Sequence, residues 1–204
     1  MDQRTDEWFQ ARLGKVTASN VYKIMSQTKT GYSADRANYM AQLVCERLTG
    51  KQQESYSNAA MQWGTEQEPF ARAAYEAKFN TMVEEVGFIQ HPTIEMAGAS
   101  PDGIVGNGMV EIKCPNTATM IDILLEDKIE AKYLKQMQWQ MACTGKDWCD
   151  FVAFDPRLSD EMKLYVARVE RNQRLIDEME EQVRKFLAEV DSKVTLLREK
   201  WQKS

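Results

Sequence analysis

The sequence has little histidine and no long apolar segment. A single histidine, His91, occurs among 204 residues, and no run approaches the roughly 18 apolar residues that a membrane helix needs. One imidazole cannot build a histidine-rich metal site. His91 precedes Pro92, where we expect a structural role, so Ser-His-Asp triads and histidine-dependent nucleases are excluded as well. Because no secretory leader is evident either, we expect a cytoplasmic protein without membrane contact.

Cysteine is also sparse and unclustered. None of the four cysteines has a partner at Cys-x-x-Cys spacing, which argues against zinc and iron–sulfur sites and favours a reduced, intracellular protein. The content of 43% hydrophobic and 28% charged residues is typical of a globular protein, and the length suits one domain over residues 1–204. Residues from about 172 to 203 are apolar along one side, which predicts a C-terminal helix.

The charge balance is acidic, with a net charge of −5. Residues 1–56 carry 8 basic and 6 acidic side chains, whereas residues 57–125 carry 3 basic and 9 acidic ones. A protein that holds nucleic acid through one large basic patch would have the opposite balance. Bound cations would offset the acidic middle segment, and a protein that encircles DNA could manage with less attraction.

Helical and strand-like segments alternate along the chain, which favours an α/β fold. Residues 59–79 predict a long helix with Trp63, Phe70 and Ala74 as its buried stripe. Residues 80–91 alternate as a strand does, and residues 96–99 predict a further strand that enters a central hairpin.

The central segment runs from Ser100 to Pro115. Its Asn107-Gly108 pair predicts a tight hairpin turn, and the next six residues alternate as a strand. Because strand side chains alternate between faces, Glu111 and Lys113 project together, and the Pro-Asp-Gly turn can bring Asp102 beside Glu111. Two carboxylates can hold Mg²⁺, and the lysine can orient or deprotonate an attacking water. A solvated strand edge with a Glu-Lys surface pair is the alternative.

Six sequence blocks extend this pattern and resemble a known family. Pro101-Asp102 followed by Glu111-Ile112-Lys113 resembles the PD-(D/E)xK nuclease signature. The wider pattern resembles the phage lambda-type exonucleases, the alkaline or recombinase exonucleases of viral recombination systems. The matching blocks are Trp8 with Arg12-Leu13-Gly14, Thr17-Ala18-Ser19, Trp63-Gly64 with Glu68, Ser100 to Gly103, Glu111 to Pro115, and Gln136 to Trp139. This chain has Trp139 where the family pattern has tyrosine, so no hydroxyl role carries over there.

The resemblance implies a restriction-endonuclease-like fold, with a central mixed sheet of about five strands flanked by helices. It implies a Mg²⁺-dependent 5′-to-3′ exonuclease that degrades one strand of double-stranded DNA processively to mononucleotides and leaves a 3′ single-stranded tail. Two Mg²⁺ ions, or Mn²⁺ in their place, are expected at one active site. The implied ligands are Asp102, Glu111, Glu68 and the Ile112 carbonyl, and Lys113 with Gln136 would position or activate water.

The same resemblance assigns the 5′ phosphate of the cut strand to Arg12, Ser19 and Ser100. From the residues alone, the free N–H groups of a helix N-terminus beside Arg12 suit an anion. The alternative is an ordinary helix-capping residue next to a surface arginine. Met61 falls where a hydrophobic wedge parts the DNA end in the family, with a core methionine as the alternative. Lys29 lies in a polar loop, where it could contact the DNA groove or remain solvated.

The implied partners are double-stranded DNA ends, two further copies of the chain in a homotrimeric ring, and a single-strand annealing protein of a phage or prophage recombination system in a bacterial cell.

Two other functions remain open. One is a metal-dependent nuclease of the same fold with endonuclease or single-strand specificity. The other is a non-catalytic DNA-binding protein, against which the intact Asp102, Glu111 and Lys113 argue.

Overall fold

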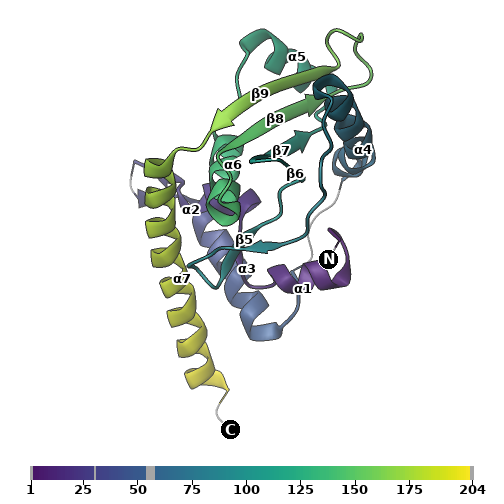
Figure 1. The fold of residues 1–204 in the computed structure, drawn as a ribbon. Coiled ribbons are helices and arrows are strands. Elements are labelled where there is room, and N and C mark those ends of the chain that lie inside the picture. The colour runs from purple at the N-terminus through teal and green to yellow at the C-terminus, as the bar shows by residue number, and fades with distance from the viewer. Residues whose placement is uncertain (1, 30, 54–57, 203–204) are drawn as a thin grey trace.

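A mixed four-stranded sheet lies at the centre of the computed structural model, which describes residues 2–29, 31–53 and 58–202 (Figure 1). The strand order is β6-β7-β8-β9, in which β7 and β8 are parallel and the two outer pairings are antiparallel. A three-stranded sheet, β1-β5-β4, and a β2-β3 hairpin accompany it. The strands are β1 Val16–Thr17, β2 Gln27–Thr28, β3 Gly31–Tyr32, β4 Ile89–Gln90, β5 Ala97–Ala99, β6 Gly103–Val105, β7 Gly108–Lys113, β8 Trp148–Phe154 and β9 Leu164–Glu170.

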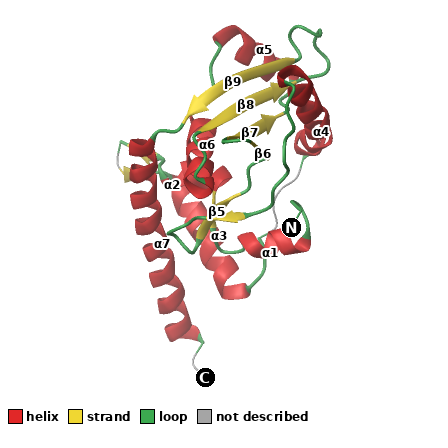
Figure 2. Cartoon of the chain, in the orientation of Figure 1, coloured by secondary structure: helices red, strands yellow, loops and turns green. Residues whose placement is uncertain are grey.

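Helices cover both faces of the central sheet, as Figure 2 shows. The helical elements are α1 Asp6–Arg12, the 3-10 turn η1 Ala18–Asn20, α2 Val21–Ile24, α3 Ala34–Thr49, α4 Ala59–Phe79, α5 Thr117–Glu126, α6 Ala131–Thr144 and α7 Gln173–Trp201. Helix α4 packs on one face through Ala71 and Tyr75. Helices α5 and α6 pack on the other face, where the contacts are rich in methionine: Met109, Met120, Met137 and Met141.

The small sheet packs with the remaining helices in a second core. Helices α2, α3 and α7 surround it, and α6 reaches it from the central sheet. The buried side of α7 matches the sequence pattern, with Ile176, Met179 and Phe186 fully inaccessible. The C-terminal helix is therefore confirmed over 173–201, while Lys203 lies outside the described residues. No helix in the described ranges combines the length and the apolarity needed to cross a bilayer.

Polar caps and a glycine define the ends of the helices that lie around the central sheet. Asn58 accepts a hydrogen bond from the Met61 N–H at the start of α4, and Asn116 accepts one from the Thr119 N–H at the start of α5. Helix α6 ends at Gly145, whose φ of 69° lies in the left-handed region that glycine adopts without strain. The helix predicted over 59–79 is thus confirmed with its bounds unchanged.

The α/β class is confirmed, but several details of the predicted sheet are wrong. The central sheet has four strands, because the strand after residue 96 joins β1 and β4 instead of the hairpin. Only β4 and one isolated bridge at Glu84 form within the strand predicted over 80–91. The hairpin turn comprises Gly106 and Asn107, with Val105 paired to Gly108. Gly106 takes the positive φ of 54°, which explains the one-residue shift.

The predicted stripe of α4 is also displaced. Phe70 is 63% exposed, whereas the neighbouring Ala71 and Tyr75 are buried against the sheet. Tyr75 donates a hydrogen bond of 2.7 Å to Asp150 on β8, a polar contact that apolar periodicity could not anticipate. The helix is therefore rotated by about one residue from the expected face.

Candidate active site

Strand β7 brings the Pro-Asp-Gly turn and the Glu-x-Lys pair together. Gly103 pairs with Val110 across the β6-β7 hairpin, so the preceding Asp102 lies beside the end of β7. An oxygen of Asp102, Oδ2, accepts a hydrogen bond of 2.6 Å from the backbone N–H of Ile112. This contact fixes the carboxylate next to Glu111 and Lys113, as the sequence pattern predicts.

Glu111 is held by protein groups from three sides. Its side chain is 1% exposed and faces α6, where Gln136 and Gln140 each donate a hydrogen bond of 2.6 Å to one carboxylate oxygen. The Lys113 ammonium forms an ion pair with the same carboxylate and lies 5.2 Å from the ring centroid of Tyr133. A carboxylate, an ammonium and two amides thus meet on one face of β7.

Burial and like charges shape the protonation of this group. Burial raises the pKa of Asp102 well above its ordinary value, and the carboxylates of Glu111 and Glu68 add to the rise while Lys113 opposes it. Burial alone would lower the pKa of Lys113. The neighbouring Glu111 and Asp102 outweigh that effect and raise the pKa of the lysine, so it remains an ammonium at neutral pH.

Glu68 approaches the same place from α4. It lines a pocket of about 410 Å³ together with Asp102, Glu85 and the N-terminal residues Gln3 and Arg4. Its two oxygens are engaged by guanidinium groups, at 2.5 Å from Arg4 and 3.3 Å from Arg72.

The donor set suits a hard divalent cation in charge and chemistry. The candidate ligands are all oxygens, and the buried, like-charged carboxylates gather negative charge that a cation would neutralise. Within the described ranges, however, no three His, Cys, Asp or Glu side chains are arranged as a ready ligand group. In this structure Glu68 contacts two arginines, and Glu111 contacts Lys113 and two amides.

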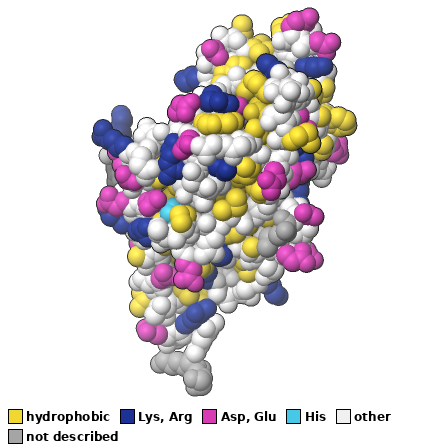
Figure 3. All heavy atoms as spheres, in the orientation of Figure 1, with side chains coloured by type: hydrophobic (Ala, Val, Ile, Leu, Met, Phe, Trp, Pro, Cys, Tyr) yellow, Lys and Arg dark blue, Asp and Glu magenta, His cyan; other side chains and the backbone are white. Residues whose placement is uncertain are grey.

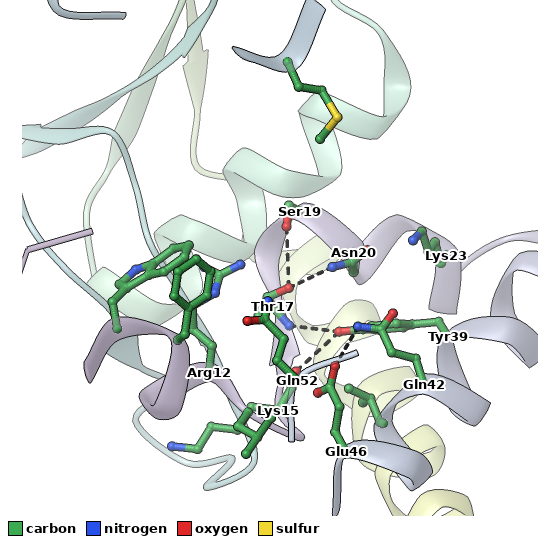
Figure 4. A pocket seen from close by; sticks show the side chains of 15 residues that line it. Arg12, Lys15, Thr17, Ser19, Asn20, Lys23, Tyr39, Gln42, Glu46 and Gln52 are labelled. Carbon is green, nitrogen blue, oxygen red and sulfur yellow. Dashed lines mark hydrogen bonds between the residues drawn. The ribbon is translucent and has the colours of Figure 1, made fainter. Parts of the chain in front are cut away.

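A second pocket, of about 530 Å³, contains two of the residues assigned to the 5′ phosphate. Arg12, Ser19 and Met61 all line it, and Figure 4 shows Arg12 and Ser19 at the same hollow. The Arg12 guanidinium stacks on the Trp8 ring at 3.9 Å from the centroid. It also donates a hydrogen bond of 3.1 Å to the Ser100 hydroxyl, two residues before Asp102. The predicted phosphate residues and the hairpin carboxylate are thereby physically connected.

Arg12 has the features of an anion-binding group. Burial lowers the pKa of Arg12 to about 10, although Tyr39 and Glu46 oppose the shift. In the described part of the chain its side-chain hydrogen bond goes to a neutral hydroxyl, so the positive charge is not paired directly. Lys15 and Lys23 line the same pocket and add positive charge.

The two other predicted DNA contacts, Met61 and Lys29, are both exposed. Met61 is 55% exposed in the first turn of α4, so it is not the core methionine that the sequence left as the alternative. Lys29 follows β2 in an exposed position and does not line the Arg12 pocket. Trp139, the departure from the family pattern, is fully buried and stacks on His91 at 5.0 Å between ring centroids.

Sequence reasoning missed one residue of the site. Gln140 was not missed, because its position one turn after Gln136 indicates a shared polar helix face, and in the structure it completes the amide pair on Glu111. Arg4 contacts Glu68 across 64 residues of sequence, and no local pattern marks such a contact.

The visible surface shows no single basic face. In Figure 3, Lys and Arg side chains are scattered among Asp and Glu side chains. This agrees with the net charge of −5, and the Arg12 pocket itself combines Arg12, Lys15 and Lys23 with one carboxylate, Glu46.

Known structures share this arrangement of elements. The chain is similar to an alkaline exonuclease, LHK-Exo from Laribacter hongkongensis, with 54% identity and a TM-score of 0.90 over 96% of this chain and 97% of that one. The structure of LHK-Exo in complex with dAMP gives 55% identity, the same coverage and the same TM-score of 0.90. A phage-related exonuclease from Haemophilus somnus 129PT has 19% identity and a TM-score of 0.73 over 90% of this chain and 96% of that one, which concerns the fold alone.

These similarities confirm the resemblance to lambda-type exonucleases. The family model of the YqaJ-like viral recombinase domain matches residues 7–147. Because the match spans more than half of the 204 residues, the chain belongs to the YqaJ-like viral recombinase domain family.

Proposed function

We propose that the protein is a Mg²⁺-dependent exonuclease that degrades one strand of double-stranded DNA from its 5′ end and leaves a 3′ single-stranded tail. The observation that carries this is the meeting of Asp102, Glu111 and Lys113 at the end of β7. A non-catalytic DNA-binding protein has no need to bury two carboxylates beside an ammonium. The 55% identity to a protein described as an alkaline exonuclease supports the same reading.

The cation would be held by Asp102, Glu111, Glu68 and the Ile112 carbonyl, with Mg²⁺ as the native ion and Mn²⁺ as a substitute. A Mg²⁺ pair at such a site supplies charge neutralisation at the scissile phosphate and a more acidic bound water. Oxygen ligands are the type that Mg²⁺ prefers.

Lys113 and Gln136 act on the reacting groups. The raised pKa keeps Lys113 protonated, so it serves as a hydrogen-bond donor and a positive charge beside the phosphate and orients the attacking water. Gln136 already donates to Glu111, and its amide can hold the same water through its oxygen. Deprotonation of water by Lys113 is therefore the less favoured of its two roles.

The pocket of about 530 Å³ that Arg12 lines, the Arg12 pocket, would set the direction in which the strand is digested. Arg12, Ser19 and Ser100 would seat the terminal 5′ phosphate, because a guanidinium that donates to a neutral hydroxyl and two hydroxyls match phosphate oxygens. Met61 borders the same pocket and is exposed, which suits a wedge against the terminal base pair. Lys29 would contact the duplex groove from its exposed loop.

The assembly we propose is a homotrimeric ring around DNA, which would make digestion processive for an acidic chain. The natural partner would be a single-strand annealing protein that receives the 3′ tail. The name of the family, a viral recombinase domain, supports a place in recombination and a phage or prophage origin.

A digestion assay tests the activity. Wild-type protein with Mg²⁺ should degrade linear duplex with 5′-phosphorylated ends and leave closed circles and single strands largely intact. Lys113→Ala should lower the rate by about a hundredfold or more while DNA binding is retained. Lys185 is an exposed lysine on α7 that pairs with Glu181, so Lys185→Ala is the matched control and should cleave normally.

Each rival function gives a different result in this assay. Cutting of closed circles at the same rate would establish an endonuclease, and preference for single strands would establish a single-strand nuclease. DNA binding without any cleavage would leave a non-catalytic protein. Equal rates on phosphorylated and dephosphorylated 5′ ends would remove the role given to Arg12.

A further inference from the structure

The N-terminal segment, residues 2–5, lies directly over the proposed metal site. Gln3 donates hydrogen bonds of 2.9 Å to the Val86 carbonyl and 2.8 Å to the Pro101 carbonyl, and Pro101 immediately precedes Asp102. The Thr5 hydroxyl donates to the Asp2 carbonyl at 2.9 Å and closes the segment on itself. These contacts attach the segment to the turn that carries the catalytic carboxylate.

Arg4 takes a backbone conformation that requires such support. Its φ is 67°, in the left-handed region that non-glycine residues occupy only when their surroundings hold them. The hydrogen bonds of Gln3 and Thr5, on either side of Arg4, supply that hold. From this position the Arg4 guanidinium reaches Glu68 at 2.5 Å.

The contact concerns a carboxylate that is also a proposed metal ligand. Both Glu68 oxygens are engaged, one by Arg4 and the other by Arg72 at 3.3 Å. Arg72 lies on the same helix as Glu68 and is 14% exposed, whereas the Arg4 side chain is 50% exposed and belongs to an irregular segment. Arg4 is consequently the partner that can leave without disturbing a helix.

We propose that Arg4 is a positioning residue that exchanges with the divalent cation at Glu68. Without the ion, its guanidinium neutralises Glu68 inside the pocket that Glu68 shares with Asp102. When the ion binds, the Glu68 oxygen turns to it and Arg4 withdraws toward solvent. The inference rests on the proposed metal site and adds a residue that sets the affinity for the ion.

Direct Mn²⁺ binding without DNA tests the exchange. Electron paramagnetic resonance of free Mn²⁺ gives the dissociation constant for the wild type and for Arg4→Gln, Arg4→Lys and Gln3→Ala. Arg4→Gln should bind Mn²⁺ about three- to tenfold more tightly, because the competing ion pair is gone. Arg4→Lys should lie between Arg4→Gln and the wild type, since an ammonium lacks the planar fork of the guanidinium.

Gln3→Ala distinguishes direct exchange of Arg4 for the cation at Glu68 from simple electrostatic repulsion between Arg4 and the cation. It leaves every charge in place and removes the hydrogen bonds that hold Arg4 over Glu68, so Mn²⁺ should bind about two- to threefold more tightly. Arg174→Gln removes a 91% exposed arginine on α7 and should change nothing. The Mg²⁺ concentration that gives half-maximal cleavage should fall by the same factors.

The outcomes separate this inference from the proposed function. If the wild type binds Mn²⁺ and Arg4→Gln binds it equally well, the exchange is overturned while the metal site stands. If only Arg4→Gln binds more tightly and Gln3→Ala does not, the effect is charge repulsion and the exchange is likewise overturned. If no variant binds Mn²⁺, the metal site and the exchange fall together.

Discussion

Glu111 owes its orientation to a pair of amides on one helix. Gln136 and Gln140 lie one turn apart on α6 and donate to opposite oxygens of the carboxylate. Gln140 is fully buried, so it cannot be a solvated surface group. Around metal sites, groups that orient a ligand carboxylate commonly affect activity as strongly as some direct contacts do, and we propose Glu111 as such a ligand.

Replacing Gln140 should therefore impair turnover. We expect Gln140→Leu to lower kcat by about ten- to a hundredfold with little change in DNA affinity, because Glu111 loses one of its two amide donors. Gln138→Leu is the control on the same helix, since Gln138 donates to the Glu170 carbonyl and does not contact Glu111. Single-turnover digestion of a short duplex measures both, and equal losses of kcat in the two variants would contradict the prediction.

His91 should make stability depend on pH. It is buried against Trp139, and its Nδ1 accepts a hydrogen bond from the Thr93 N–H at 3.2 Å. Burial lowers the pKa of His91 below its ordinary value, while Glu180 opposes the shift and Arg184 reinforces it. Below the unfolded-state pKa the unfolded chain binds a proton that the folded chain resists. The imidazole therefore destabilises the fold as pH falls from 7.5 to 5.5, by at most about 1.4 kcal/mol per pH unit.

A comparison with His91→Gln isolates this effect, because the variant lacks the titrating group. The difference in urea unfolding free energy between wild type and variant should favour the wild type less at pH 5.5 than at pH 7.5. Parallel pH curves for the two proteins would mean that the folded and unfolded states hold the proton equally well.

Predictions about single residues were confirmed where they depend on neighbours in the sequence. The period of two along β7 placed Glu111 and Lys113 on one face, and the structure has them in contact. Arg4 and Glu68 meet only because distant segments pack together, so no spacing rule could pair them. Which residues hold the metal and the 5′ phosphate stays a prediction.

At the scale of elements, α4 has two distinct halves. Its buried residues, Ala71 and Tyr75, lie after Pro69, which lacks an N–H and removes one helical hydrogen bond in the middle of the helix. The earlier half carries Glu68 and Met61 and rests on the sheet at Gly64, where an added Cβ would lie 3.7 Å from the Cys114 carbonyl oxygen. The half that faces the proposed site is thus the less firmly packed one.

Two glycine replacements, one on α4 and one on β7, test the local packing in opposite directions. Gly64→Ala should stabilise the protein by up to about 1 kcal/mol, because alanine favours helix and the new methyl group has room. Gly108→Ala should destabilise it by about 1–3 kcal/mol, since its Cβ would lie 2.1 Å from the Trp148 ring. Thermal unfolding of both variants measures the contrast. Loss of stability in Gly64→Ala would show that α4 lies closer to β7 than described.

Long elements were predictable and short ones were not. The helices over 59–79 and 173–201 have enough turns for periodicity and caps to define them. Strands β1 and β4 have two residues each, and their pairing depends on partners far along the chain. For that reason the strand over 80–91 and the placement of the strand at 96–99 were wrong, whereas the fold class was right and the central sheet has four strands where about five were expected.

For the whole molecule, the dispersed charge makes the mode of DNA binding the central question. With a net charge of −5 and no basic face in view, a single chain has little general attraction for a duplex. A ring of three copies would retain DNA by topology, so digestion would continue after the initial contact without a strong electrostatic grip.

Solution mass gives a direct test of this assembly. Light scattering after size exclusion should give about three times the chain mass of 23.5 kDa, and digestion should resist a competitor duplex added after the reaction starts. A monomeric mass together with immediate inhibition by the competitor would reject the ring. A monomer that still digests processively would require another means of retention.

Four buried methionines lie near the proposed site and can serve as spectroscopic probes of it. Met109 lies on β7 and Met120, Met137 and Met141 on α5 and α6; the four share one core cluster on the face of the sheet that carries Glu111, and each is fully buried. Their terminal methyl groups can be labelled with carbon-13 and observed one by one in solution spectra, without altering any polar group. Shifts in these lines as ions and nucleotides are added would record how events at the carboxylates are transmitted into the interior.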